Sequence, residues 1–246
     1  MAMFQTIRNM ACFALLASLS ACANAPDDLA VNTNDPYEDF NRNMFAFNMK
    51  VDDIAVEPAA KGYRNLPQVN QDMMTNFADW TTLPSTSLNS ALQGDAENAA
   101  LGVLSFLVNG LTLGMADLTD DSDDPVQTNF EDTMRGYEVP QGRYIVLPFI
   151  GPGSTRSHSA WLVDSVTNPL RFASTPAAST ITAVSPPVRV VSYRGNHYDL
   201  INDVKYGSLD PYSRTRSIYL QYGANIGDSD DQSKDDPFDA FIQSQE

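Results

Sequence analysis

The most constraining feature of this chain is an uncharged segment of 19 residues, 98–116 (NAALGVLSFLVNGLTLGMA), between Glu97 and Asp117. Its length is at the lower limit for a helix that crosses a bilayer. However, its glycines weaken a continuous helix, Asn109 would be left polar in hydrocarbon, and the flanks are acidic rather than basic. We therefore expect a helix that is buried in the fold, or one that lies partly in a single membrane leaflet, rather than a span.

The N-terminus has the pattern of a lipoprotein signal. Residues 10–19 (MACFALLASL) form an apolar core after Arg8 that is too short to span a membrane. The following Leu-Ser-Ala-Cys resembles a bacterial lipobox, which predicts a signal peptide at 1–21 and a lipidated Cys22. Ala23 at the next position fits sorting to the outer membrane. The alternative is a soluble secreted protein that is cut at an Ala-x-Ala-like site.

Cysteine content and charge narrow the class of protein. The chain has two cysteines, of which Cys12 would leave with the signal and Cys22 would carry lipid, so we expect neither a disulfide nor a thiolate metal site. The net charge of −16 disfavours binding to nucleic acid. We expect a flexible tether at 22–33, one folded domain at 34–223 and an acidic, disordered tail at 224–246.

The first helix has a marked start and end. Asp35 is the expected N-cap, Pro36 occupies the first helical position, and Glu38 would close a capping box. We expect the helix to end near Glu57, because a proline at 58 restricts the residue before it.

This helix also carries an apolar stripe of helical period, made by Phe40, Met44, Phe47, Val51 and Ile54. A stripe of this kind usually faces a protein core. Its richness in aromatic residues and methionine leaves open a helix that contacts acyl chains.

Further elements follow from turn and cap signals. We expect helices at 69–80 and 84–94 and a compact loop or short hairpin around 144–150. For 169–188 we expect a loop, with a short helix inside it as the alternative. A closing helix should begin at Pro211 after Asp210 and end at Gly223. The acidic segment 117–132 has no glycine for a calcium-binding loop, so we expect a solvated loop.

No catalytic pattern emerges from the sequence. Ser154 lies four residues before His158, but the segment lacks the second glycine of a nucleophile elbow. No cluster of histidine and carboxylate residues has the spacing of a zinc site. We expect no enzymatic activity, no metal and no cofactor, with a lipid hydrolase as the alternative.

Four segments together resemble the VacJ/MlaA family of outer-membrane lipoproteins. They are 34–42 (NDPYEDFNR), 106–118 (FLVNGLTLGMADL), 143–156 (RYIVLPFIGPGSTR) and 209–222 (LDPYSRTRSIYLQY). The motifs occur in order over nearly the whole body. The chain departs from the family at 130–133 (FEDT), where members usually have Gly-Gln-Thr after a phenylalanine.

The resemblance implies a mainly α, ring-shaped body in the periplasmic leaflet of the outer membrane, anchored through Cys22, with an amphipathic channel. Its implied partners are phospholipid, an outer-membrane trimeric porin and a soluble periplasmic lipid-carrier protein. The family removes phospholipid that has strayed to the outer leaflet and passes it to the carrier. A structural lipoprotein that stabilises a porin or the envelope is the alternative.

Candidate residues come from the loop within 143–156 and from the first helix. Glycine and proline in the loop suggest a channel wall or gate, or else a rigid turn; its candidates are Tyr144, Leu147, Pro148, Phe149, Gly151, Pro152 and Gly153. Asn41 and Arg42 are candidates for fixing the first helix or meeting headgroups, with a plain salt bridge as the alternative. Met44, Phe45 and Phe47 are candidates for contact with the leaflet.

Overall fold

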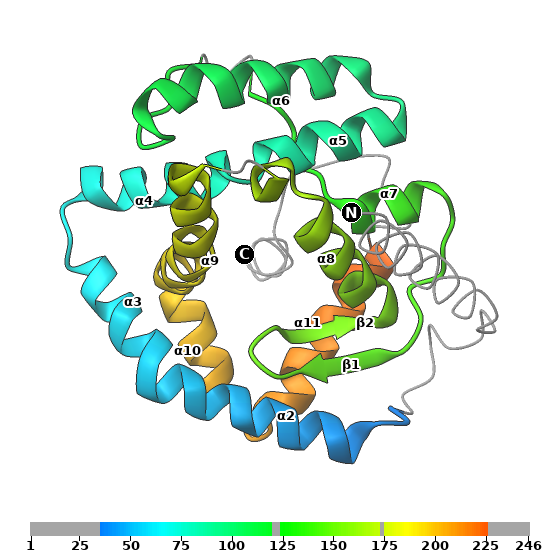
Figure 1. The fold of residues 1–246 in the computed structure, drawn as a ribbon. Helices are drawn as coiled ribbons and strands as arrows, with labels where there is room; N and C mark the ends of the chain where they lie inside the picture. Colours follow the sequence, from blue (N-terminus) through cyan, green and yellow to red (C-terminus); the bar gives the residue numbers. More distant parts are fainter. Residues whose placement is uncertain (1–34, 120–123, 173–174, 226–246) are drawn as a thin grey trace, which may run out of the picture.

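The computed structural model describes residues 35–119, 124–172 and 175–225. Within these ranges the chain is mainly helical, and its helices follow a ring-like path (Figure 1). Helices along the lower edge of the view lead through α4 to the pair α5 and α6 at the upper edge, and α9 lies on the inner side of α4. The expected signal peptide, the lipidated Cys22, the tether at 22–33 and most of the tail at 224–246 lie outside the described residues.

The first helix is longer than predicted. Helix α2 (Glu38–Val51) continues through a π-helical turn, η3 (Asp52–Val56), into α3 (Glu57–Arg64). The prediction of an end near Glu57 is wrong, because Pro58 occupies the first turn of α3, directly after the widened turn. Proline is tolerated in the first turn of a helix, because the backbone N–H that it lacks has no intrahelical acceptor there.

The start of α2 also differs from the prediction. Asp35 lies before the helix, where its Oδ1 accepts the Tyr37 N–H at 3.0 Å. Glu38 does not close a capping box; its carboxylate is 2.7 Å from Arg42 Nε, one turn along the helix.

The next helices confirm the sequence reading to within a residue. They are α4 (Gln68–Trp80) and α5 (Leu83–Gln93), which ends at Gly94 with φ 84°. Helix α6 (Ala96–Asn109) starts at Asp95, whose side chain accepts the Asn98 N–H at 2.9 Å, and a short 3-10 turn, η4 (Gly110–Thr112), follows it. Helices α5 and α6 pack against each other.

A hairpin forms where a hairpin or compact loop was expected. Helix α7 (Phe130–Gly136) precedes strands β1 (Tyr144–Leu147) and β2 (Gly151–Ser154), which pair antiparallel, and α8 (Thr155–Thr167) follows directly. In the acidic segment 117–132, residues 117–119 and 124–129 have no helix or strand, which agrees with the loop expected there. The last three residues, 130–132, belong instead to the first turn of α7.

The loop expected at 169–188 is wrong for most of its length. After the short turn η6 (Pro169–Phe172), helix α9 (Pro176–Asn196) runs through Pro186 and Pro187. Each proline removes a backbone donor, so local preference opposes this helix. Packing of α9 against α3 and α4 outweighs that cost, and Gly195 allows a close approach to Tyr63, because a Cβ on Gly195 would lie 2.3 Å from the ring.

Two helices complete the ring. They are α10 (Tyr198–Gly207) and α11 (Pro211–Asn225). Asp210 caps α11 as predicted, since its Oδ1 accepts the Ser213 N–H at 3.2 Å. The helix continues two residues past Gly223, where the sequence suggested an end.

Candidate functional site

Helix α2 buries a polar residue beside an apolar one. Its buried residues are Asn41 and Phe45, followed by Asp52 in the π turn, while Phe40, Phe47 and Ile54 of the apolar stripe are exposed, Ile54 by 80%. The expectation that the stripe faces the core is wrong for these three residues, whereas Met44 packs against the core and Val51 is half-buried. Part of the apolar surface is thus exposed while polar side chains are buried, which reverses the usual arrangement of a helix in water.

Helix α6 has the same reversed arrangement. Small and polar residues at helical spacing form its buried face: Asn98, Gly102, Ser105 and Asn109. Val103, Leu104 and Leu107 are exposed, so the expectation of a helix wholly buried in the fold holds for one face only. Helix α5 follows the pattern, with Ser85, Thr86, Ser87, Asn89 and Ser90 buried and Leu88 and Leu92 exposed.

The inward asparagines of α6 are hydrogen-bonded, whereas Ser105 Oγ is buried without a hydrogen-bond partner among the described residues. Asn98 donates to Ser90 Oγ at 2.7 Å and to the Val126 carbonyl at 2.9 Å, and its Oδ1 accepts the Val126 N–H at 2.7 Å. Asn109 donates to Asp117 Oδ1 at 3.0 Å and accepts the Leu118 N–H at 2.7 Å. The two amides thereby attach the start of the acidic segment and its middle, at Val126, to α6.

The exposed apolar residues continue beyond α6 into the turn that follows. This second group comprises Leu111, Leu113, Met115 and Leu118. Among the described helices, none has both the length and the apolar character needed to cross a bilayer.

Asparagine side chains of α2 also bind the hairpin. Asn41 is fully buried; it accepts the Val146 N–H at 2.8 Å and lies 3.3 Å from the Tyr144 carbonyl. Two helical turns later, Asn48 accepts the Phe149 N–H at 2.8 Å and donates to the Leu147 carbonyl at 2.9 Å. The sequence reading missed Asn48, although its spacing of seven residues from Asn41 places both on one face of a helix.

The two Asp-Pro-Tyr segments of the sequence meet in space. The Tyr212 hydroxyl donates to Asp35, which also accepts from Asn41 Nδ2 at 3.1 Å. Arg42 donates to both carboxylate oxygens of Asp210, and its guanidinium lies 4.5 Å from the centre of the Tyr212 ring. Arg42 therefore makes a salt bridge, and together these contacts join the start of α2 to the start of α11.

The predicted contact residues on α2 separate into inner and outer positions. Phe45 lies in the core, where its ring packs edge-on to Tyr212 at 5.7 Å, so the surface position expected for it is wrong. Met44 packs against the same core. Phe47 is exposed and touches Phe149 edge-on, with 5.1 Å between ring centres.

The loop candidates divide in the same way. Tyr144 belongs to the core, and burial raises the pKa of its hydroxyl. Gly153 is also buried, where a Cβ would lie 2.5 Å from the His158 ring. The exposed part of the hairpin is its tip: Pro148, Phe149, Ile150 and Pro152 are exposed, and Leu147 and Gly151 are half-buried. Gly153 is therefore needed for packing, and Gly151 has the positive φ, 99°, that suits glycine.

Ser154 and His158 have separate structural roles. Ser154 caps α8, and its Oγ accepts the Ser157 N–H at 3.1 Å. His158 Nε2 is 2.9 Å from the Ile145 carbonyl. Burial lowers the pKa of His158. Since each side chain is used in a different contact, the geometry supports no nucleophile and base pair here.

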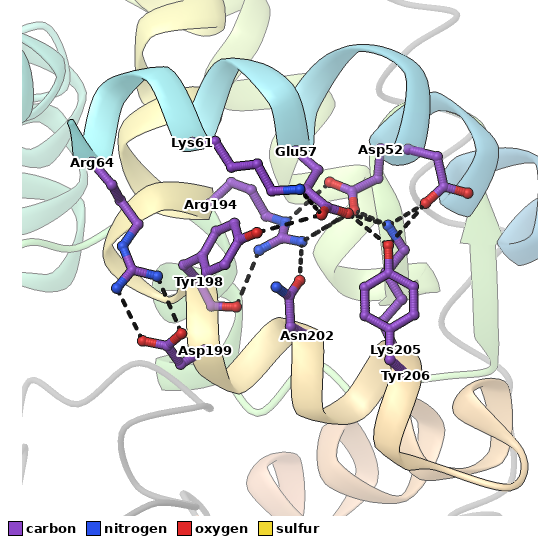
Figure 2. Close-up of polar contacts among 11 residues, drawn as sticks. Asp52, Glu57, Lys61, Arg64, Arg194, Tyr198, Asp199, Asn202, Lys205 and Tyr206 are labelled. Carbon is purple, nitrogen blue, oxygen red and sulfur yellow. Dashed lines mark hydrogen bonds and ion pairs between the residues drawn. The ribbon is translucent and has the colours of Figure 1, made fainter.

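An ion cluster fills the junction of the π turn with α9 and α10 (Figure 2). Lys205 Nζ lies 2.6 Å from Asp52, 2.6 Å from Asp53 and 2.9 Å from Glu57. A π turn hydrogen-bonds residues five apart, here the Glu57 N–H and the Asp52 carbonyl, so it stacks these two side chains on one side. The widened turn thus explains how carboxylates at 52 and 57 converge on one ammonium.

Further cations and donors neutralise the same carboxylates. Arg194 Nε lies 3.0 Å from Asp52, Lys61 Nζ lies 2.8 Å from Glu57, and the Tyr206 hydroxyl donates to Glu57 at 2.7 Å. Hydrogen bonds from Lys61, Tyr206 and Lys205 hold the pKa of Glu57 well below its usual range.

The carboxylate oxygens of Asp52, Asp53 and Glu57 lie within 4.8 Å of one another, which is the spacing of a candidate metal site. However, the ammonium of Lys205 contacts all three. Burial opposes the charge of Lys205, but hydrogen bonds to the carboxylates outweigh it and raise its pKa. The cluster is therefore an internal ion network. The sequence reading missed it, and its one local signal is a pair of aspartates inside an amphipathic helix.

Comparison with known proteins agrees with this architecture. The model of the MlaA lipoprotein family matches residues 33–225. A protein of Rickettsia bellii is 33% identical over 199 residues, covering 76% of this chain and 74% of the relative. The intermembrane phospholipid transport system lipoprotein MlaA of Escherichia coli is 28% identical over 215 residues, 82% of each chain.

A solved structure described as the structural basis for maintenance of bacterial outer membrane lipid asymmetry has 26% sequence identity and a TM-score of 0.61. It covers 76% of this chain and 96% of its own. The family model spans the helices that carry the reversed polar and apolar faces. On this evidence the chain belongs to the MlaA lipoprotein family.

Proposed function

We propose that this lipoprotein takes mislocalised phospholipid from the outer leaflet of the outer membrane and passes it to a soluble periplasmic carrier. Membership of the MlaA family and the solved neighbour on lipid asymmetry support a role in phospholipid transport. In this proposal the chain is anchored through Cys22 in the periplasmic leaflet, beside a trimeric porin. It acts as a passage for lipid rather than as an enzyme.

The observation that carries the proposal is the reversed polarity of α5 and α6, which α2 shows in part. Helices α5 and α6 bury mainly asparagine, serine and threonine and expose leucine and valine, while α2 buries Asn41 beside Phe45 and exposes Phe40 and Phe47. In water this arrangement is unfavourable, because apolar surface is lost to solvent while polar groups are desolvated. In hydrocarbon it is favourable, since small and polar residues then join the helices and apolar ones face the lipid. We infer a body embedded within one leaflet.

A passage through a ring of this kind would let a lipid headgroup cross without entering hydrocarbon. An unsatisfied polar group in hydrocarbon costs several kcal/mol, roughly 2–7 by transfer measurements, so a polar inner wall lowers the barrier to movement. We assign to the wall or gate of this passage the exposed tip residues Pro148, Phe149 and Pro152 together with the half-buried Leu147 and Gly151. Phe47 contributes the apolar contact from α2.

The test is the phospholipid content of the outer leaflet, measured by palmitoyl transfer to surface lipid A. Cells would carry wild type, a deletion, Cys22→Ala or Cys12→Ala. The last is a matched control, because these are the two cysteines of the chain and position 12 falls within the expected signal. We expect surface phospholipid to rise in the deletion and in Cys22→Ala, and to stay at the wild-type level in Cys12→Ala.

The outcomes separate the alternatives. Unchanged surface phospholipid in the deletion would contradict the transport role and favour a structural lipoprotein. If Cys22→Ala restores surface phospholipid to the wild-type level, the lipid anchor at Cys22 is contradicted but the transport role is not. Loss of function on Ser154→Ala with an intact fold would instead point to a hydrolase.

A further inference from the structure

The turn of the hairpin is held by one side chain from another element. The carboxamide of Asn48 on α2 donates to the Leu147 carbonyl at 2.9 Å and accepts the Phe149 N–H at 2.8 Å. These are the two bonds that a neighbouring strand would make with an extended chain. The side chain therefore satisfies both backbone groups where the strand β1 ends.

The backbone that Asn48 holds is unfavourable for the residue it carries. Phe149 has φ 65°, in the left-handed region that residues other than glycine and asparagine rarely adopt. In this conformation its side chain is 76% exposed and its ring meets Phe47 edge-on at 5.1 Å. A strained backbone that persists in this way requires surrounding contacts to hold it, and strain of this kind is concentrated at functional sites.

We propose that the hairpin tip is an acyl-chain contact of the lipid passage, formed by the ring pair Phe47 and Phe149, and that Asn48 is the residue that positions it. The inference deepens the proposed transport function and rests on it. Asn48 makes the tip compatible with hydrocarbon, because it satisfies the backbone donor and acceptor that water would otherwise satisfy.

The chemistry of the tip identifies the part of the lipid that it meets. Residues 147–153 (LPFIGPG) contain no polar side chain and no charge. They therefore offer a phosphate or an amine headgroup no side-chain hydrogen bond. Leu147, Phe149 and Ile150 can contact an apolar chain through dispersion and burial of surface alone.

The test combines backbone exchange with crosslinking in cells. Asn48→Ala is compared with Asn43→Ala, a matched control on the same helix, where the amide donates only to the Asp39 carbonyl of its own helix. We expect Asn48→Ala to raise the hydrogen-exchange rate of the Phe149 amide by about tenfold, as expected for loss of one hydrogen bond. The Val146 amide, which bonds to Asn41, should keep its wild-type rate.

A photoreactive benzophenone amino acid in place of Ile150 reports the contact itself. Irradiated cells fed a radiolabelled fatty acid should yield a labelled adduct, which Asn48→Ala reduces severalfold and Asn43→Ala leaves unchanged. Phe149→Gly removes the ring but suits the positive φ, so it should abolish the adduct while the fold is retained. This variant keeps the proposal testable even if Asn48→Ala fails to fold.

Two results would overturn the proposal: an adduct with protein but not lipid, or an unchanged adduct and exchange rate in Asn48→Ala. The measurement of surface phospholipid in the deletion strain is independent of both. If the deletion raises surface phospholipid while these variants behave as wild type, transport stands and the acyl-chain contact fails. If the deletion has no effect, the transport function itself fails.

Discussion

Arg42 on α2 donates to both carboxylate oxygens of Asp210 before α11, with N–O distances of 3.1 and 2.9 Å across 168 residues of sequence. Both side chains are partly exposed, by 40% and 43%. Hydrogen bonds from Arg42 hold the pKa of Asp210 well below its usual range. The pair therefore connects the two ends of the described chain without being buried.

We expect Arg42→Ala to lower the free energy of unfolding by about 1 kcal/mol at pH 7, since solvent weakens an exposed pair even when its geometry is bidentate. Because the folded pKa of Asp210 is depressed, this contribution is full above about pH 4, the unfolded value. It is lost as the pH falls through the lower folded pKa. Urea unfolding of purified protein at several pH values, followed by circular dichroism, measures the difference.

Arg64→Ala is the control for that experiment. Arg64 also makes a two-point contact, with Asp199 on α10, but that carboxylate is 85% exposed. The loss should be smaller than in Arg42→Ala. An equal or larger loss in Arg64→Ala would refute the importance of the contact between the two Asp-Pro-Tyr segments.

The ion cluster predicts a large difference between two lysines that contact one carboxylate. Lys205→Met leaves the buried carboxylates of Asp52 and Glu57 short of a cation, and the side chain of Lys205 is only 6% exposed. We expect a loss of about 3–5 kcal/mol, the usual effect of breaking a buried pair. Lys61→Met also removes a partner of Glu57, but Lys61 is 58% exposed, so we expect a much smaller loss than in Lys205→Met.

Thermal and urea unfolding of both lysine variants in detergent would give these values. Similar losses for the two would show that burial does not govern the strength of the cluster. Protein that accumulates poorly only as Lys205→Met would agree with the prediction, and Lys205→Arg should then restore part of the accumulation.

The reversed polarity of α6 predicts that substitution of Gly102 lowers the stability of the fold more than substitution of Leu107. Gly102 faces α5, where a Cβ would lie 2.4 Å from Ser87 Oγ, so Gly102→Leu should lower the free energy of unfolding by about 1–3 kcal/mol. Leu107 is 64% exposed, and Leu107→Ala should change the free energy of unfolding by less than about 0.5 kcal/mol in detergent. A helix with an inward leucine face would give the opposite order in the same unfolding measurement.

The lowered pKa of His158 predicts that the folded protein loses stability under mildly acidic conditions. Burial lowers its folded pKa, although the hydrogen bond with the Ile145 carbonyl partly opposes this. A histidine with a depressed pKa contributes stability that is full above its unfolded pKa, about 6.5, and is lost as the pH falls through the folded value. The melting temperature of wild type should therefore fall more steeply below pH 6.5 than that of His158→Gln. Parallel curves for the two proteins would contradict this.

Local signals in the sequence predicted much of the secondary structure. The boundaries of α4 and α5, the start of α11 at Pro211 and the hairpin at 144–154 agree with expectation. Each depends on residues that are neighbours in sequence, such as a cap, a proline at the first position or a glycine after the last turn. The family was also evident from four short motifs.

Other elements depended on distant contacts. Helix α9 forms through Pro186 and Pro187 because α3 and α4 pack against it, and the long first helix continues past Pro58 through a π turn. Lys205 lies 153 positions after Asp52, one of the carboxylates that it binds. No local sequence pattern therefore marks this lysine. The partners of Asn41 and Asn48 lie on the hairpin, about a hundred residues further along the chain.

The sequence by itself determined the boundaries of α4 and α5, the start of α11 and the family to which the chain belongs. Only the tertiary structure decided which side of each helix is buried. The apolar stripe of α2 has the same period whether it faces a core or a membrane. Periodicity shows that the apolar residues share one face of the helix, but not whether that face contacts protein or lipid. The contacts of Asn41, Asn98 and Asn109 place the polar faces inside and leave the apolar faces outside.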